Sequence, residues 1–204
     1  EVYASLVTAT SQMMYYLKEK KKITSANILS ILRGALNYPL EESCYKEHIR
    51  VHDISFMSSE RVFENGEMTG LEIKYCKLAT VPNSTLLIGD IIASGESMLD
   101  IAYELKMRGA RNIFTCCTFP LFTAGLEKFD KAYNDGIIKA VLGTNLTYRK
   151  PELLEREWYY DVDVSKYTAY FIAAINHDKS VSSIIDPMTK IRTLLDKHGI
   201  PMGG

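Results

Sequence analysis

Short apolar runs alternate with helical patterns along this 204-residue chain, and the alternation limits the folds that it can adopt. Runs typical of buried strands occupy residues 27–32, 49–57, 86–90, 112–120, 137–145 and 158–164. Helical patterns occupy residues 2–20, 39–47, 97–108, 122–134, 165–176 (with Ser165 as the expected cap) and 187–197. Apolar strands that alternate with helices predict an α/β fold, with a right-handed parallel sheet flanked by helices on both faces.

The composition is that of an ordinary globular domain, with 47% apolar residues, 24% charged residues and a net charge of −1. This balance favours neither nucleic acid nor membrane as a partner, and no apolar run reaches the roughly 20 residues that span a bilayer. The first residues lack a signal-peptide pattern, and the four cysteines, which form no CxxC pair, are expected to be reduced and buried. We therefore expect a single cytoplasmic domain over residues 1–204.

The segment 58–84 is polar and carries Asn-Gly and Thr-Gly turn signals, which are typical of a hairpin. A connection of this length inside a compact domain is usually functional or mobile. We therefore expect a mobile loop at about residues 58–84.

Three strands are expected to end in polar turns, at Arg33-Gly34, Gly89-Asp90 and Gly143-Thr144-Asn145. In open parallel sheets, ligands bind at the carboxyl ends of the strands. The middle turn is the most informative, because the small residues 93–97 follow Asp90 and open a helix. Such a turn directs backbone N–H groups at a phosphate, while a carboxylate binds sugar hydroxyls. The pattern predicts a ligand with a ribose 5-phosphate, although a plain strand-to-helix turn remains the alternative.

Residues 86–97, LLIGDIIASGES, resemble the motif with which type I phosphoribosyltransferases bind phosphoribosyl pyrophosphate (PRPP). In that family two acids follow an apolar strand and hold the ribose hydroxyls, and a small-residue loop holds the 5-phosphate. The resemblance implies a PRPP site formed by Gly89, Asp90, Ala93, Ser94, Gly95, Glu96 and Ser97.

Other segments resemble members of the same family. SILRGALNYPL resembles the pyrophosphate loop of uracil phosphoribosyltransferases, which implies PRPP contacts from Arg33, Gly34 and Ala35. ERVFENGEMTGLEIKYCKL resembles their mobile loop, which implies that Arg61 contacts pyrophosphate. Residues 108–183 resemble the carboxyl half of PRPP synthetases.

The chain departs from the family pattern at three positions of the motif. Gly89 replaces the first acid, Glu96 adds a negative charge inside the loop, and Ala93 stands where purine-using members often carry an acid. The glycine-rich segment that reads uracil has no match, and neither does the amino-terminal half of PRPP synthetases.

Outside the motif, the scattered histidines lack metal-ligand spacing, so we expect no metal held by the protein alone. The pairs Tyr15-Tyr16 and Tyr159-Tyr160 are expected to pack in the core or in a dimer interface. Asn145 and Tyr148 are candidates for binding the acceptor.

The resemblance implies a phosphoribosyltransferase that uses PRPP and Mg²⁺, transfers the phosphoribosyl group to an unidentified acceptor and releases pyrophosphate. Arg61 and Asp90 are the expected catalytic residues, and a homodimer is the expected assembly. Two alternatives remain, a non-catalytic PRPP or nucleotide sensor and a regulatory homologue of PRPP synthetase.

Overall fold

The computed structural model describes residues 3–31, 37–64, 67–76 and 84–181, of which residues 3–8, 37–38, 56–64 and 67–76 are described in their backbone alone. The central feature is one seven-stranded sheet of order β3-β2-β1-β4-β5-β6-β7. Its strands are β1 (Ser25–Ile31), β2 (Arg50–Glu64), β3 (Glu67–Cys76), β4 (Ser84–Ile92), β5 (Asn112–Pro120), β6 (Ala140–Thr144) and β7 (Tyr159–Val162).

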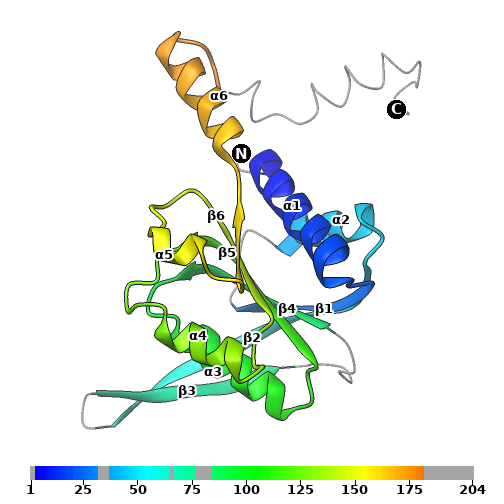
Figure 1. Cartoon of the computed structure of the whole chain (residues 1–204), viewed down its shortest axis with the longest axis vertical. Helices are drawn as coiled ribbons and strands as arrows, with labels where there is room; N and C mark the ends of the chain where they lie inside the picture. Colours follow the sequence, from blue (N-terminus) through cyan, green and yellow to red (C-terminus); the bar gives the residue numbers. More distant parts are fainter. Residues whose placement is uncertain (1–2, 32–36, 65–66, 77–83, 182–204) are drawn as a thin grey trace.

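All strands but β3 run parallel, as the alternation of strands and helices predicts. β3 runs antiparallel to β2, so the expected hairpin forms within the segment 58–84. Only residues 65–66 separate these two strands, and so short a connection cannot make the crossover that parallel strands require. Figure 1 shows this hairpin extending well beyond the body of the domain.

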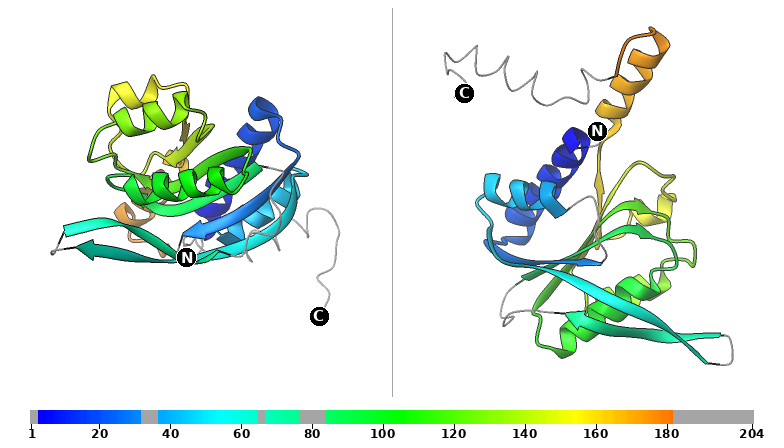
Figure 2. Two further views of the ribbon diagram at one scale, coloured as in Figure 1. Left: turned by 90° about the horizontal axis from the view of Figure 1, so that it is seen from below. Right: turned by 180° about the vertical axis from the view of Figure 1, so that it is seen from behind.

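Helices cover both faces of the sheet (Figures 1 and 2). On one face α1 (Tyr3–Lys21) and α2 (Asn37–Lys46) bury Met13, Leu17 and Leu40 against Ile28 and Leu86. On the other face α3 (Glu96–Met107) and α4 (Glu127–Asn134) bury Ile101 and Phe129 against Leu87 and Val141. Residues 86 and 87 therefore alternate between two cores, as strand geometry requires.

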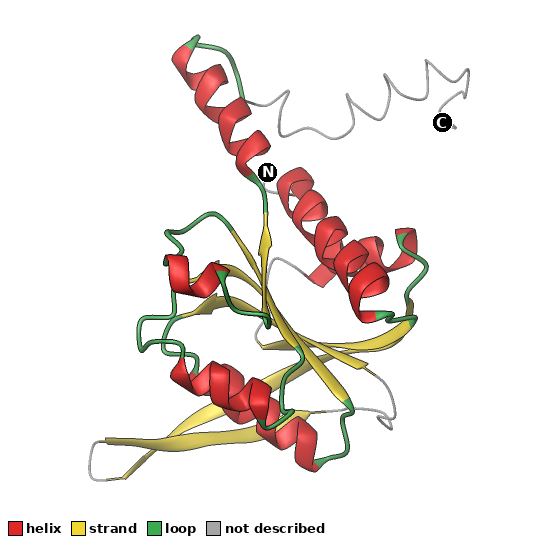
Figure 3. Ribbon diagram, in the orientation of Figure 1, coloured by secondary structure: helices red, strands yellow, loops and turns green. Residues whose placement is uncertain are grey.

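The remaining helices are a single turn, α5 (Pro151–Leu154), which the sequence does not reveal, and α6 (Ser165–Asn176). Figure 3 shows α6 projecting from the end of the domain. Ser165 is the first residue of α6 rather than its cap, because Asp163 Oδ1 accepts the Ser165 N–H at 2.9 Å.

Several predicted boundaries are wrong, because a neighbouring element captures the backbone. The strand expected over 49–57 continues to Glu64 beside β3, and the strand expected to end at Gly89-Asp90 continues to Ile92 beside β5. The helix expected over 122–134 begins at Glu127, since Phe122 N–H donates to the Ile92 carbonyl at 3.0 Å. The strand expected over 137–145 begins at Ala140, since Ile137 N–H donates back to Ala132 at 2.8 Å and closes α4. The helix expected over 187–197 lies outside the described residues.

Cys44, Cys116 and Cys117 are buried and form no disulfide, as predicted, and burial raises the pKa of the Cys44 thiol to about 12. Tyr16 of α1 stacks on Tyr160 of β7 with ring centroids 4.0 Å apart, so this pair joins a helix to the edge of the sheet. In the described part of the chain, no helix is long and apolar enough to cross a bilayer.

Candidate PRPP site at the carboxyl edge of the sheet

The register of the strands brings several candidate residues to one edge. Gly89 of β4 pairs with Cys117 of β5, which pairs with Gly143 of β6, which pairs with Asp161 of β7. Neighbouring strands lie about 4.8 Å apart, so this row extends about 14 Å from Gly89 to Asp161. The row lies near the carboxyl ends of the strands, one to three residues before each strand ends, and Asp90 follows it within β4.

Arg61 lies on an extension of this edge. Met57 of β2 pairs with Ile31, the last residue of β1, and β2 continues from there to Glu64. At about 3.3 Å per residue, the backbone of Arg61 is about 13 Å beyond the end of β1. There it pairs with Leu71 of β3. Arg33, Gly34 and Ala35, the predicted pyrophosphate loop, lie outside the described residues.

The turn between β4 and α3 depends on Gly95, which is the N-cap of α3 and has a left-handed backbone with φ 81°. A Cβ atom built there would lie 2.6 Å from Phe129 Cζ on α4, so the backbone approaches the buried ring closely. Glycine is therefore required twice at this position, for its dihedral angle and for its missing side chain.

The loop that follows β5 contacts this turn from one side. Thr123 N–H donates to the Ala93 carbonyl at 2.9 Å, and Leu121 N–H donates to the Ile92 carbonyl at 2.9 Å. These bonds use carbonyl groups rather than the N–H groups at the start of α3, which the first turn of a helix cannot bond internally. Of these, the Glu96 N–H donates to Ser94 Oγ across 3.5 Å. Together with the half-buried hydroxyls of Ser94 and Ser97, the N–H groups form a site suited to phosphate.

Glu96 does not direct its charge into this turn unopposed, because its carboxylate forms an ion pair with Lys128 of α4. The sequence shows the acid in the loop but not the lysine that draws it aside. The same cation lies near Asp100, whose pKa is raised by burial and by Glu96 and lowered again in part by Lys128.

Gly89 and Asp90 have different surroundings. Asp90 is exposed at the end of β4, where a carboxylate can meet a ligand from solvent. Gly89 is buried, and a Cβ atom there would lie 2.7 Å from Met98 Cε of α3. The methionine therefore fills the space that the family's first acid would enter in this chain.

Asn145 is fully engaged in holding β7 and α6 against the end of β6. Its amide nitrogen donates to Asp163 Oδ1 at 2.7 Å and to Ser165 Oγ at 2.8 Å, and its Oδ1 accepts the Val164 N–H at 2.9 Å. Tyr148, the other predicted acceptor contact, is 80% exposed. Ala93 is exposed as well.

Replacement of Asn145 by alanine should lower the free energy of unfolding by about 1–3 kcal/mol, because three side-chain hydrogen bonds are lost. Tyr148→Ala is the control and should change stability by less than about 0.5 kcal/mol, as is usual for an exposed side chain. Urea denaturation of both variants checks this. Equal effects at the two positions would contradict the structural role of Asn145.

Arg149 and Asp161 form an ion pair that the sequence analysis does not predict. Arg149 Nε lies 2.7 Å from Asp161 Oδ1, and both side chains are about one quarter exposed or slightly more. Burial raises the pKa of Asp161, and the arginine partly opposes this rise. Because Asp161 stands in the same row as Gly89, this pair presents a second polar group to the carboxyl edge of the sheet.

No metal centre is formed by protein groups over the part of the chain that the structure describes, where no three His, Cys, Asp or Glu side chains come together. Asp90 provides an exposed carboxylate just before the turn into α3, and oxygen is the ligand that Mg²⁺ prefers.

No family model matches the sequence, and no curated protein matches it. Among solved structures the chain is similar to phosphoribosylpyrophosphate synthetase from Mycobacterium smegmatis, with a TM-score of 0.55 and 11% identity over 83% of this chain. The match covers 51% of the synthetase, so the chain spans about half of that protein. It is also similar to the hypoxanthine phosphoribosyl transferase of Trypanosoma cruzi, with a TM-score of 0.51 and 11% identity over 79% of this chain and 74% of that one. With its parallel sheet and the crossover helices on both faces, the chain has the fold of the type I phosphoribosyltransferases.

Proposed function

We propose that this protein is a PRPP-dependent phosphoribosyltransferase, which transfers the phosphoribosyl group to an unidentified acceptor. One observation carries the proposal: at the carboxyl edge of a sheet with this fold, the exposed Asp90 leads into a left-handed turn at Gly95 that opens a helix. That arrangement suits a ribose on the carboxylate and its 5-phosphate on the N–H groups of the turn.

In the proposed reaction the bond from ribose C1 to the pyrophosphate oxygen breaks, and pyrophosphate leaves with the electron pair. The acceptor's nucleophilic atom forms the new bond to C1 and loses its proton. Asp90 and residues 93–97 fix the ribose phosphate, while Arg61 and Arg33 stabilise the negative charge that grows on the leaving group. Closure of the segment 58–84 over the site would exclude water, which otherwise hydrolyses PRPP.

The proposal includes Mg²⁺, which when bound supplies positive charge to the pyrophosphate oxygens. Asp90 is the side chain that would complete its oxygen ligands, beside water and the substrate itself. We further propose a cytoplasmic homodimer, the arrangement expected from the sequence.

The acceptor is proposed to bind between the end of β4 and the Arg149–Asp161 pair, rather than on Asn145, whose hydrogen bonds are already made within the protein. A half-buried ion pair at this edge favours an acceptor that carries both hydrogen-bond donors and acceptors.

A second candidate function, binding of PRPP or a nucleotide without turnover, is favoured by the buried Gly89, because the usual first acid is missing and Met98 fills its place. Release of pyrophosphate distinguishes the two. The wild-type protein, given PRPP, Mg²⁺ and a panel of nucleobases, amines and phenols, should release pyrophosphate with at least one acceptor. PRPP binding without any release across the panel would favour the sensor.

Ser97→Asp should weaken PRPP binding by a hundredfold or more, since a carboxylate against the 5-phosphate costs several kcal/mol. Met107 is the last residue of α3, at the end opposite the turn, and its side chain is 85% exposed. Met107→Asp therefore adds the same charge away from the phosphate and should leave the PRPP affinity within about twofold. Calorimetry of both variants measures this. Wild-type affinity in Ser97→Asp would overturn the assignment of the phosphate turn.

A further inference from the structure

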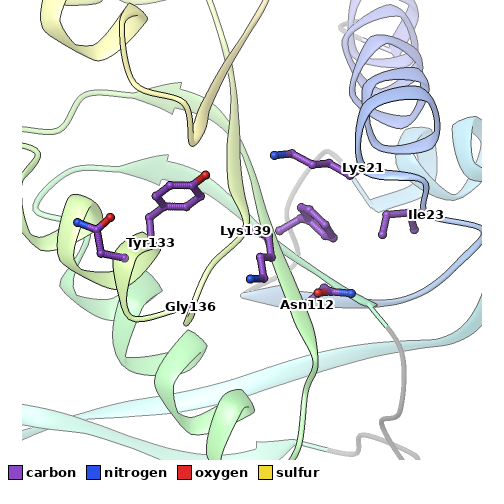
Figure 4. A pocket seen from close by; sticks show the side chains of 8 residues that line it. Lys21, Ile23, Asn112, Tyr133, Gly136 and Lys139 are labelled. Atoms are coloured by element: carbon purple, nitrogen blue, oxygen red, sulfur yellow. The ribbon is translucent and has the colours of Figure 1, made fainter.

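A cavity lies at the opposite edge of the sheet from the candidate PRPP site. It has a volume of about 430 Å³ and is lined at the amino ends of the strands by Ile23, Asn112 and Lys139, and by residues at the ends of α1 and α4 (Figure 4). Asn112 is the first residue of β5, and Lys139 directly precedes β6. β5 has 9 residues, so its length separates the cavity from the carboxyl edge by about 25–30 Å.

Two lysines from different segments line this cavity, Lys21 at the end of α1 and Lys139 before β6. Lys21 Nζ lies over the Tyr16 ring, 5.9 Å from its centroid, and Figure 4 shows the Lys21 side chain extending from the end of α1 at the cavity. Two other lysines of α1 and α4 form ion pairs, Lys18 with Glu47 and Lys131 with Asp135. Within the described residues no acidic group lies within 4 Å of Lys21 or Lys139, and no acid lines the cavity.

The position of Lys21 is set by the backbone. Ile23 N–H donates to the Leu17 carbonyl at 3.1 Å, and Lys22 adopts a left-handed conformation with φ 56°, so α1 ends in a closed turn. A lysine at a helix carboxyl end also benefits from the helix dipole. That benefit does not explain Lys139, which is held on the other side by its N–H bond to Ile113 at 2.8 Å.

The remaining wall is apolar and aromatic. Ile23 and Phe114 are buried residues of the core around α1, and Tyr133 is half-buried against the opposite core. The Asn112 amide donates to Ser84 Oγ at 3.4 Å, which leaves its carbonyl oxygen to accept a bond. The cavity thus combines two lysine ammonium groups with the ring of Tyr133, and the side-chain amides of Asn112 and Asn134 also line it.

We propose that this cavity binds a nucleoside phosphate, with its phosphates on Lys21 and Lys139 and its base against the half-buried ring of Tyr133. The site is separate from the candidate PRPP site, so a nucleotide bound there does not compete with PRPP. Its occupancy would follow the cellular nucleotide concentration. An aromatic surface accepts a base by stacking, and two ammonium groups suit a diphosphate.

The test is a calorimetric titration with ADP. Because the candidate PRPP site also accepts phosphates, the titration is done in the presence of saturating ribose 5-phosphate and repeated in Ser97→Asp. ADP should bind in both cases. Lys21→Gln/Lys139→Gln should weaken this binding about a hundredfold, roughly tenfold for each charge-assisted contact.

The matched control is Lys150→Gln/Lys179→Gln, which removes the same charge at exposed positions outside the cavity and should leave ADP affinity unchanged. Amide shifts of Gly136 and Lys139 should change on addition of ADP to the wild type. Absence of ADP binding, equal effects of the two double variants, or pyrophosphate binding as tightly as ADP would overturn the proposal. Because these measurements use no PRPP and no acceptor, failure here leaves the proposed transferase activity unaffected.

Discussion

Replacement of Gly95 by alanine is expected to lower the free energy of unfolding by about 2–5 kcal/mol and to abolish PRPP binding. A left-handed backbone costs a residue with a Cβ atom about 1–2 kcal/mol, and overpacking of a core typically adds about 1–3 kcal/mol. Both costs apply here, because Gly95 has φ 81° and its Cβ atom would lie 2.6 Å from Phe129 Cζ. Phe129 belongs to α4 and is fully buried in the core, so its ring cannot move aside freely.

Gly136 provides the matched control. It also has a positive φ, 71°, but a Cβ atom there would meet nothing within 4 Å. Gly136→Ala should therefore show only the backbone cost, about 1–2 kcal/mol. Urea denaturation followed by circular dichroism gives both values. If the two alanine substitutions lower the free energy of unfolding by the same amount, the inferred close contact between the turn and Phe129 is wrong.

Arg61→Ala is expected to lower kcat about a hundredfold or more and to weaken PRPP binding much less. The proposed role of Arg61 is to stabilise charge that develops on pyrophosphate as the C1–O bond breaks, and loss of one such preorganised donor typically costs about 2.7–4 kcal/mol. An interaction made mainly in the transition state lowers kcat rather than raising KM. Steady-state kinetics with pyrophosphate detection, combined with PRPP binding by calorimetry, separates the two effects.

Arg50→Ala is the control for this experiment, because Arg50 lies in the same strand as Arg61 but at its amino end, where it is exposed and pairs with Ser25. It should leave kcat within about twofold. Turnover that survives Arg61→Ala unchanged would refute the role of the hairpin arginine. A loss of PRPP affinity with kcat unchanged would show instead that Arg61 binds the ground state and the transition state equally.

The order of the main strands and helices and the position of the proposed phosphate turn follow from the sequence alone. Both rest on local patterns: apolar runs of strand length, helical spacing between them, and a small-residue turn after Asp90. The substitution of glycine for the first acid at position 89 is equally plain in the sequence. The hairpin within 58–84 was predicted from its turn signals, although its antiparallel place at the edge of the sheet was not.

The tertiary structure alone decides what surrounds these residues, because the contacts join positions far apart in the chain. Two of these contacts come from α4: Phe129 packs against Gly95, and Lys128 forms an ion pair with Glu96. Asp161 reaches the row of Gly89 only through the pairing of three further strands.

The same holds for Asn145, where a local pattern predicted a ligand contact and the tertiary structure shows hydrogen bonds within the protein. A strand end in a parallel sheet is open to ligands in general, but whether a particular side chain is free depends on the segments that return to pack beside it. Here β7 and α6 return to Asn145, and no local spacing could have shown it.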